Sequence, residues 1–229
     1  KANCIIYAGS LVNKALFAMS KADIYDSSGL NLDQIIDIIR GSVEQGGVVA
    51  RVHTGDPSLY GATKEQMVRL ESLNIDFEMI PGVSSAFGSA SSLGAELTLP
   101  ELTQTVIITR KGGRTPVPEA ERLDLLASHG ATMMIFLSVG MIEGVVEDLL
   151  NGSYTDATPV SVVQRATWPD EKIISGTLGN IAQRVKREGI TKTAMICVGP
   201  VFGKSALQAE SKLYDKHFSH GTRKAVSDG

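Results

Sequence analysis

Short apolar runs alternate with helical patterns along most of this 229-residue chain. The apolar run at 48–52 is followed by a helical pattern at 63–73, and another apolar run follows at 77–80. Alternating strands and helices are typical of α/β folds, because each helix carries the chain back to begin the next parallel strand. The sequence therefore predicts an α/β fold in which helices cover mainly parallel sheets.

Capping residues and apolar spacing set the other expected elements. A helix is expected after Asn31, where Gln34 completes a capping box, and a similar start is expected at Thr63 with Gln66. The remaining expected strands are 4–7, 104–109, 132–137, 159–164, 171–175 and 193–198, and the remaining expected helices are 84–93, 118–129, 141–150 and 178–188.

One segment interrupts this alternation. Residues 96–103 read ELTLPELT, with a proline in the middle. We place a domain boundary there, which predicts an N-terminal α/β domain at 1–101 and a C-terminal α/β domain at 102–203. Residues 204–229 are polar and lose periodicity, so they are expected to form a loosely held tail.

Composition excludes several classes of protein. A net charge of −3 argues against a nucleic-acid partner, since such domains are usually basic. No apolar run approaches the roughly 18 residues of a membrane span, and no signal-peptide pattern opens the chain. Cys4 and Cys197 lie in apolar runs, which favours buried thiols over a disulfide framework. We therefore expect a cytoplasmic protein with no membrane partner.

The most informative turn is Gly55-Asp56-Pro57, which directly follows an apolar run. Open α/β folds bind ligands at the carboxyl ends of parallel strands. Glycine lets the backbone approach a ligand closely, and proline stiffens the turn. A plain surface turn is the alternative, because Asp-Pro beside glycine is common turn chemistry. The Leu59-Tyr60 pair that follows makes the two interpretations about equally good.

A second turn of this kind lies at 81–85, PGVSS, before an expected helix. Ser84 and Ser85 are suited to cap that helix. The start of a helix also offers N–H groups to a ligand, and the two roles are compatible. Two such turns in one half of the chain predict a small-molecule site.

Cationic residues cluster after one expected strand, at Arg110, Lys111 and Arg114, and Arg165 flanks another turn. Each could be an ordinary solvated side chain, or together they could bind a polycarboxylate, which the guanidinium fork suits. There is no GxGxxG, P-loop or GxSxG motif. The histidines and cysteines lack metal-ligand spacing, so no metal site is expected. These arguments leave the reaction open.

Four longer strings are more specific: VHTGDPSLYGA, PGVSSAFGSASSLGAELTLPELTQTVIITR, GRTPVPE and QRATWPDEKIISGTL. They resemble the precorrin-4 / cobalt-precorrin-4 C11-methyltransferases of cobalamin biosynthesis, a branch of the tetrapyrrole methyltransferase family. The resemblance runs from about Asn3 to Phe202. The Gly-Asp-Pro turn alone would indicate the wider family, whereas LPELTQTVIITR and RATWPDEK indicate the C11 branch.

The resemblance implies a tetrapyrrole methyltransferase-like fold, with S-adenosylmethionine in the cleft between two α/β domains, usually in a homodimer. The cofactor-binding residues that it implies are Gly55, Asp56, Leu59, Ser84, Ser85, Leu137 and Ala166. The substrate-binding residues that it implies are Tyr7, Ser10, Arg110, Arg114 and Arg165. The family also has a first strand and a GxGPGDP turn before the segment that matches the start of this chain. An interior strand of the first sheet is therefore expected to be missing.

The implied reaction is transfer of a methyl group from S-adenosylmethionine to C11 of a tetrapyrrole. The sulfonium donor is already activated, so the protein mainly has to align it with the carbon nucleophile. Asp56 could favour the cationic donor electrostatically. No catalytic base is identified, and the sequence leaves open whether cobalt is already in the substrate. Two alternatives remain: methylation of another position or tetrapyrrole, such as uroporphyrinogen III, and a non-catalytic tetrapyrrole- or nucleoside-binding protein.

Overall fold

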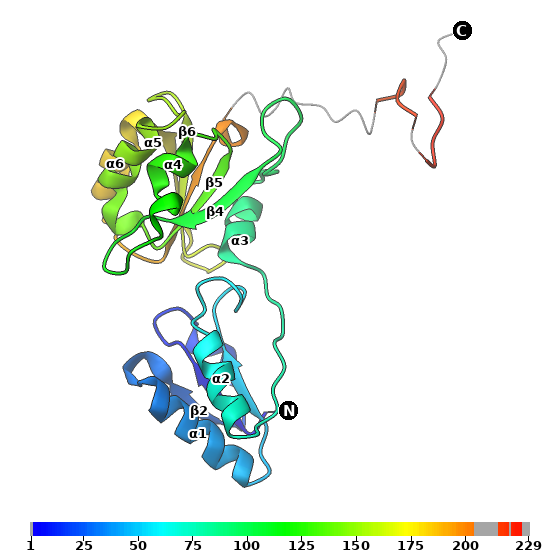
Figure 1. The fold of residues 1–229 in the computed structure, drawn as a ribbon, viewed down its shortest axis with the longest axis vertical. Helices are drawn as coiled ribbons and strands as arrows, with labels where there is room; N and C mark the ends of the chain where they lie inside the picture. The colour runs from blue at the N-terminus through cyan, green and yellow to red at the C-terminus, as the bar shows by residue number, and fades with distance from the viewer. Residues whose placement is uncertain (1, 204–214, 220, 226–229) are drawn as a thin grey trace. The chain divides into compact units, whose positions relative to one another are not determined.

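The computed structural model describes residues 2–203, 215–219 and 221–225 (Figure 1). The chain divides into two compact units, Lys1–Ser85 and Ala86–Gly229. Residues soon after the division already pack on the second sheet, since the hydroxyl of Thr132 donates a hydrogen bond of 2.8 Å to the Leu97 carbonyl. The domain boundary expected at 101/102 stays a prediction. The expected tail lies mostly outside the described residues.

The first unit contains a three-stranded sheet whose strands are all parallel, in the order β2-β1-β3. Its elements are β1 (Cys4–Tyr7), η1 (Lys14–Phe17), β2 (Asp23–Asp26), η2 (Ser27–Gly29), α1 (Leu32–Glu44), β3 (Val49–Val52) and α2 (Lys64–Ser72). Both long helices lie on the same face of the sheet (Figure 1). Parallel strands place all their carboxyl ends at one edge, where the following turns meet.

The core of the first unit is small. Ile36 and Ile39 of α1 and Leu70 of α2 pack against Cys4 and Ile6 of β1. These buried residues recur at helical spacing in α1 and alternate along β1, as the apolar pattern of each element requires. The second face of the sheet contributes no member to this cluster.

The start of α1 confirms the predicted capping box. The Asn31 carboxamide oxygen accepts from the Gln34 backbone N–H at 3.0 Å, and the Gln34 side chain accepts from the Asn31 N–H at 3.0 Å. The start of α2 differs from the prediction. Thr63 occupies the N-cap position but makes no side-chain cap, and its hydroxyl donates to the Pro57 carbonyl instead.

In the first unit one expected strand is wrong, and one observed strand was not predicted. Residues 77–80 are not a strand, because among the described residues this segment pairs with no strand that could supply the ladder hydrogen bonds. Within the described residues, β3 pairs with β1 alone. The strand β2 was not expected, since its four residues, DIYD, are short and charged. At 77–80 and in β2, the presence or absence of a pairing strand, rather than the apolar content of the segment, determined whether a strand formed.

The second unit contains a five-stranded mixed sheet, in the order β4-β5-β8-β6-β7. Its elements are α3 (Ser85–Ser92, beginning at the last residue of the first unit), β4 (Val106–Arg110), η3 (Glu119–Glu121), α4 (Leu123–Ala127), β5 (Thr132–Phe136), η4 (Val139–Met141), α5 (Ile142–Leu150), β6 (Pro159–Gln164), β7 (Lys172–Thr177), α6 (Leu178–Arg187), β8 (Ala194–Val198) and η5 (Pro200–Phe202). β4 and β5 are parallel, and the other three pairings are antiparallel. The α/β class is confirmed, with parallel pairing complete only in the first sheet.

Helices cover both faces of the second sheet. The helices α4, α5 and α6 pack on one face, where Met133, Ile135 and Ile196 are fully buried. On the other face α3 packs against Met134 and Cys197. The alternation along β5 and β8 therefore divides the core into two layers.

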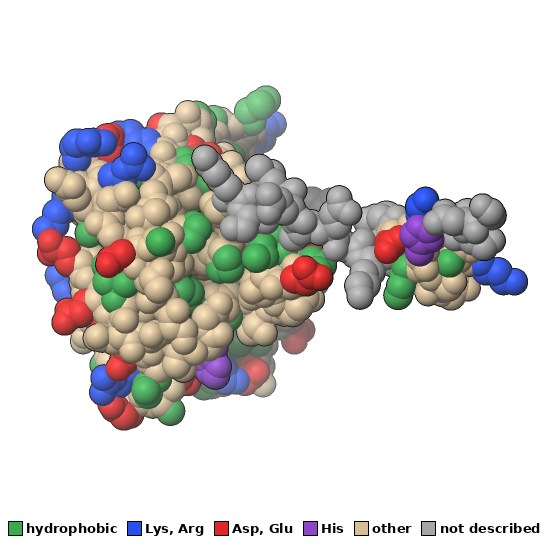
Figure 2. Space-filling model, turned by 90° about the horizontal axis from the view of Figure 1, so that it is seen from above, with side chains coloured by type: hydrophobic (Ala, Val, Ile, Leu, Met, Phe, Trp, Pro, Cys, Tyr) green, Lys and Arg blue, Asp and Glu red, His purple; other side chains and the backbone are tan. Residues whose placement is uncertain are grey.

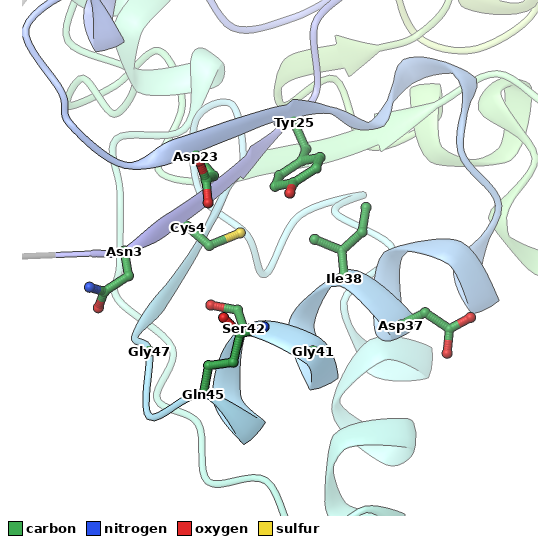
Figure 3. Close-up of a pocket in the computed structure, with 10 residues that line it drawn as sticks. All are labelled: Asn3, Cys4, Asp23, Tyr25, Asp37, Ile38, Gly41, Ser42, Gln45 and Gly47. Carbon is green, nitrogen blue, oxygen red and sulfur yellow. The ribbon is translucent and has the colours of Figure 1, made fainter.

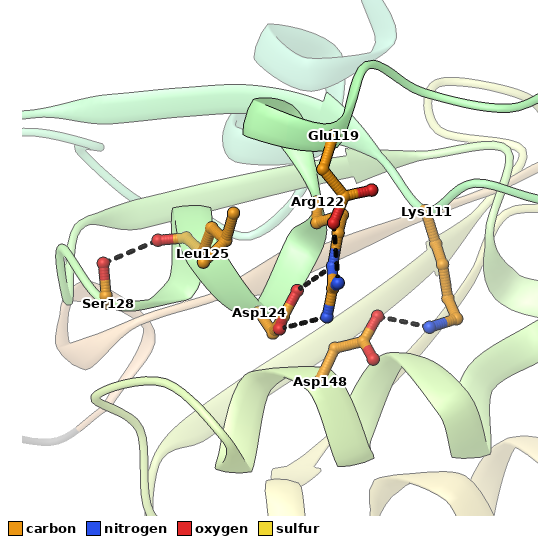
Figure 4. A network of polar contacts seen from close by, with 7 residues as sticks. All are labelled: Lys111, Glu119, Arg122, Asp124, Leu125, Ser128 and Asp148. Carbon is orange, nitrogen blue, oxygen red and sulfur yellow. Dashed lines mark hydrogen bonds and ion pairs between the residues drawn. The ribbon is translucent and has the colours of Figure 1, made fainter.

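The expected helix at 118–129 is broken into η3 and α4. Arg122 lies at the break, with extended backbone angles of φ −57° and ψ 142°. Its guanidinium binds Asp124 at 2.8 Å and Glu119 at 2.8 Å (Figure 4). These two ion pairs stabilise the break from opposite sides, and the sequence pattern gave no sign of it.

The surface carries charges of both signs. On the face that Figure 2 draws, basic and acidic side chains are interspersed. No helix among the described residues has the length and apolar character needed to cross a membrane.

Candidate functional site

Two turns lie against each other at the carboxyl edge of the first sheet. The Asp56 turn (residues 55–58) follows β3, and the Gly82 turn (residues 81–85) precedes α3. Gly55 has a φ of +64°, a conformation that favours glycine. A Cβ at Gly55 would lie 3.3 Å from the Ser85 backbone nitrogen and 3.4 Å from the Ser84 Cα. The structure therefore brings Gly55, Ser84 and Ser85 close together.

Asp56 links the two turns through its carboxylate. One carboxylate oxygen accepts from the Ser58 backbone N–H at 2.9 Å and from the Ser58 hydroxyl. The other accepts from the Gly82 backbone N–H at 2.9 Å. The Ser58 hydroxyl, followed by the Gly82 and Ser58 N–H groups, lowers the pKa of Asp56. The carboxylate therefore stays ionised at neutral pH and holds the turns in register.

Position 82 requires glycine, because the two turns are in such close contact there. A Cβ at Gly82 would lie 2.1 Å from the Gly55 carbonyl oxygen, a main-chain atom that has no rotamer in which to move away. The two turns thus meet through their backbones. The contact consists of main-chain groups and small side chains at the end of β3.

The loop after Asp56 has an unusual backbone. Tyr60 has a φ of +53° and Ala62 a φ of +48°, which non-glycine residues rarely adopt. Leu59 donates its N–H to the Asp56 carbonyl at 3.3 Å and is partly buried. Strained residues of this kind cluster at functional sites, since only a constrained neighbourhood maintains them. No pattern in the neighbouring sequence predicted these positive φ angles.

The end of β1 reaches the same edge. Tyr7 is buried, and its ring centroid lies 5.2 Å from that of Phe17. The Gly9 N–H donates to the Asp26 carboxylate at 3.0 Å, and Ser10, beside it, is exposed. Of the two predicted substrate residues here, Ser10 is the one on the surface.

At the carboxyl edge of the second sheet, two strained turns follow β5 and β6. Leu137 follows β5 with a φ of +53° and leaves 68% of its surface exposed. Arg165 and Thr167, on either side of Ala166, have φ of +52° and +68°. β6 is antiparallel to β8, which is antiparallel to β5, so β5 and β6 end at the same edge. Leu137 and Ala166 therefore lie at one edge of the second unit.

Glu171 fixes the Ala166 turn onto α3. One oxygen of its carboxylate accepts from the Ser92 hydroxyl at 2.7 Å and from the Thr167 N–H at 2.6 Å. A Cβ at Gly88 of α3 would lie 3.9 Å from the Ala166 side chain. The turn and the helix thus form one packed piece of the second unit.

The predicted cationic residues differ in what they already bind. Arg110 donates to the carbonyls of Thr115 and Pro116, at 3.0 and 2.7 Å. Lys111 forms an ion pair with Asp148 (Figure 4).

The other two arginines lie on exposed turns. Arg165 forms an ion pair with Asp170, and its guanidinium lies 5.7 Å from the Trp168 ring centroid. Arg114 is exposed, and within the described ranges no hydrogen bond or ion pair engages it. Arg114 is thus the predicted substrate arginine whose guanidinium is least committed.

A separate cavity of about 350 Å³ lies in the first unit, between α1 and the strands β1 and β2 (Figure 3). Asn3, Asp23 and Gly47 line it. They mark the amino ends of the strands, so this cavity lies at the opposite end of the sheet from the Asp56 turn. Among the described residues, no group of three or more His, Cys, Asp or Glu side chains is placed to hold a metal ion.

The geometry defines a class of protein: two α/β units whose sheets end in glycine-dependent, strained turns suited to a small ligand. Residues 1–182 match the family model of the Tetrapyrrole (Corrin/Porphyrin) Methylases. The chain belongs to this family, whose methyl donor is S-adenosylmethionine.

Individual relatives agree with this assignment. The chain is 56% identical to a cobalt-precorrin-4 C(11)-methyltransferase of Methanocaldococcus jannaschii, over 98% of this chain and 87% of that protein. It is 44% identical to a precorrin-4 C(11)-methyltransferase of Pseudomonas aeruginosa, over 94% and 86%. A solved cobalt precorrin-4 methyltransferase superposes with a TM-score of 0.86 at 44% identity, covering 88% of this chain and 85% of that one.

Proposed function

We propose that this protein transfers a methyl group from S-adenosylmethionine to C11 of precorrin-4, in its metal-free or cobalt form, in cobalamin biosynthesis. The observation that carries the proposal is the identity of 44–56% to C11-methyltransferases over more than nine-tenths of this chain. Identity of this extent normally preserves the reaction as well as the fold. The protein is therefore a transferase that acts on a tetrapyrrole.

The residues at the Asp56 turn fit the proposed cofactor. A nucleoside with an amino-acid tail needs close backbone approach, and the contact between Gly55 and Gly82 leaves main-chain groups rather than bulky side chains at this edge. When bound, S-adenosylmethionine supplies a methyl group on a positively charged sulfur. We propose that the cofactor contacts are Gly55, Asp56, Leu59, Ser84, Ser85, Leu137 and Ala166.

The chain's own residues bind and orient in this proposal. The Asp56 carboxylate keeps its negative charge near the positive donor, while its hydrogen bonds to Ser58 and Gly82 fix the turns. Alignment of donor and acceptor can contribute about 7–11 kcal/mol toward the barrier of such a transfer. No protein nucleophile is required. The catalytic base is left unassigned.

Substrate binding is proposed at Tyr7, Ser10, Arg110, Arg114 and Arg165. Of the arginines, Arg114 has the least committed guanidinium, so it is the first candidate to pair with a carboxylate of the macrocycle. Tyr7 is buried, so its contribution would come from supporting Ser10 and the turn around it. A homodimer in the cytoplasm is also proposed, which analytical ultracentrifugation and cell fractionation would test.

Incubation of the purified protein with labelled S-adenosylmethionine and either precorrin-4 or cobalt-precorrin-4 tests the function. We expect one methyl group per ring, placed at C11 by NMR. Methylation of another carbon, or of uroporphyrinogen III instead, would assign a different member of the family. Tetrapyrrole binding without methyl transfer would indicate a binding protein.

A further inference from the structure

Gln66, in the first turn of α2, is buried although it is a polar residue. Its side-chain N–H donates to the Ala62 carbonyl at 2.7 Å. Its side-chain oxygen accepts from the Arg51 Nε at 3.1 Å. Because both ends of the carboxamide are used, Gln66 connects the strained loop after the Asp56 turn to the sheet.

Arg51 extends this connection to two strand ends. Its Nη1 donates to the Ile6 carbonyl of β1 at 3.2 Å and to the Val52 carbonyl of β3 at 3.3 Å. No carboxylate in the described part of the chain pairs with Arg51. A partly buried guanidinium without a carboxylate is unusual, since buried charges are normally paired. Its function here is to bind the main chain where two strands end.

The loop between the Asp56 turn and α2 is held at three further points. The Thr63 hydroxyl donates to the Pro57 carbonyl at 3.3 Å. A Cβ at Gly61 would lie 2.3 Å from the same carbonyl oxygen, so the loop folds tightly back on Pro57. The Gly82 N–H holds the Asp56 carboxylate at 2.9 Å on the other side. The Gln66 bond to Ala62 closes this loop and maintains its positive φ.

We propose that Arg51 and Gln66 are positioning residues for S-adenosylmethionine binding, which they control through the loop at 57–62 without touching the cofactor. The proposal rests on the proposed cofactor site at the Asp56 turn. Replacement of Gln66 by glutamate separates its two roles. The carboxylate still accepts from Arg51, but it offers no N–H to Ala62 and places an oxygen against that carbonyl.

The test compares wild type, Gln66→Glu and Arg51→Lys in methyl-transfer kinetics and in calorimetry with S-adenosylhomocysteine. We expect KM for S-adenosylmethionine and Kd for S-adenosylhomocysteine to rise about tenfold, the usual effect of one lost buried hydrogen bond. The kcat at saturating cofactor and the KM for the tetrapyrrole should change by less than about twofold, because no reacting group moves. Gln45→Glu, at an exposed position after α1, is the matched control and should leave every constant unchanged.

Each outcome decides a different claim. If wild type does not bind S-adenosylhomocysteine, the proposed cofactor site is wrong and the positioning role with it. If wild type binds and Gln66→Glu binds equally well, only the positioning role is overturned. A lower melting temperature with unchanged KM would assign Arg51 and Gln66 to stability alone. Equal losses in kcat and in both KM values would also overturn the proposal.

Discussion

The two units of this protein differ in the size of their cores, although both carry turns with left-handed backbone. Among the described residues, the second unit has a five-stranded sheet with helices on both faces and seventeen buried residues in its main cluster. The first unit has three strands and a cluster of six buried residues, and much of its backbone is in turns. Since buried apolar area supplies most folding free energy, the second unit should be the more stable. The first unit instead carries the two turns that meet backbone to backbone.

The largest expected effect tests whether the units unfold separately. Ile196→Ala, at a fully buried position of the second unit, should lower its free energy of unfolding by about 2–5 kcal/mol. Trp168 is the one tryptophan of the chain and lies in this unit, so its fluorescence follows this transition in denaturant.

Ile6→Ala, at an equally buried position of the first unit, is the control. It should leave the Trp168 transition in place. If both substitutions shift that transition by the same amount, the units unfold as one, and the division of stability between them is not real.

Breaking the contact between the turns should remove ligand binding without unfolding the second unit. Gly82→Ala places a Cβ 2.1 Å from the Gly55 carbonyl, so one turn must move by about an ångström. We expect a loss of about a hundredfold in S-adenosylhomocysteine affinity, equal to about 2.7 kcal/mol, because the displaced turn would lose roughly two hydrogen bonds to the ligand. Isothermal titration calorimetry measures it.

Gly41→Ala provides the comparison within the same unit, because nothing lies within 4 Å of the added Cβ in α1. It should bind normally and gain about 0.5–1 kcal/mol of stability. Unchanged affinity in Gly82→Ala would show that the contact between the turns has no part in the site.

The two cysteines report on the units separately, since Cys4 lies in β1 and Cys197 in β8. Burial raises the pKa of both thiols, for Cys197 to about 12, and so disfavours the reactive thiolate of each in the folded protein. Labelling of Cys197 at pH 8 therefore requires opening of the second unit, whereas Cys4 also lines the cavity beside α1 and can be reached from it (Figure 3). If opening the first unit costs about 1.4 kcal/mol less than opening the second, Cys4 should react about tenfold faster than Cys197.

Mass spectrometry of the labelled peptides gives the two rates, and the single variants Cys4→Ala and Cys197→Ala assign them. Faster labelling of Cys197 would reverse the proposed order of stability.

The smallest effect concerns a buried hydroxyl in α3. Ser89 is fully buried, and its hydroxyl has no hydrogen-bond partner among the described residues. Ser89→Ala should raise the stability of the second unit by about 1 kcal/mol, because an unsatisfied buried polar group is unfavourable. Ser91→Ala, at an exposed position of the same helix, gains helix propensity alone. If Ser89→Ala and Ser91→Ala raise the stability measured by Trp168 fluorescence equally, the Ser89 hydroxyl has a hydrogen-bond partner such as water.

Local patterns predicted most elements of this fold. The capping box at Asn31 depends on neighbouring residues and is confirmed, and the apolar run at Cys4–Tyr7 is confirmed as β1. The expected strand at 77–80 failed because a strand needs a partner far away in sequence. The expectation of one helix at 118–129 was also wrong, since the backbone is extended at Arg122, where its guanidinium pairs with Glu119 and Asp124.

The candidate site was predictable only in part. The Gly55 and Gly82 turns were visible because glycine, aspartate and proline favour turns locally. The bond from Gly82 to the Asp56 carboxylate spans 26 residues, and the bond from Arg51 to Ile6 spans 45. Such contacts depend on how the strands assemble, so a single sequence does not reveal them. The left-handed backbone of Leu137 is likewise a property of the assembled edge.

The Glu171 anchor restricts how the turn around Ala166 can be reused. A single carboxylate oxygen serves donors from both the turn and Ser92 of α3. An aspartate would be one methylene too short to reach both. Grafting the RATWPDE segment onto another scaffold therefore requires α3 as well, because without Ser92 the Glu171 carboxylate loses one of the two donors that hold the loop.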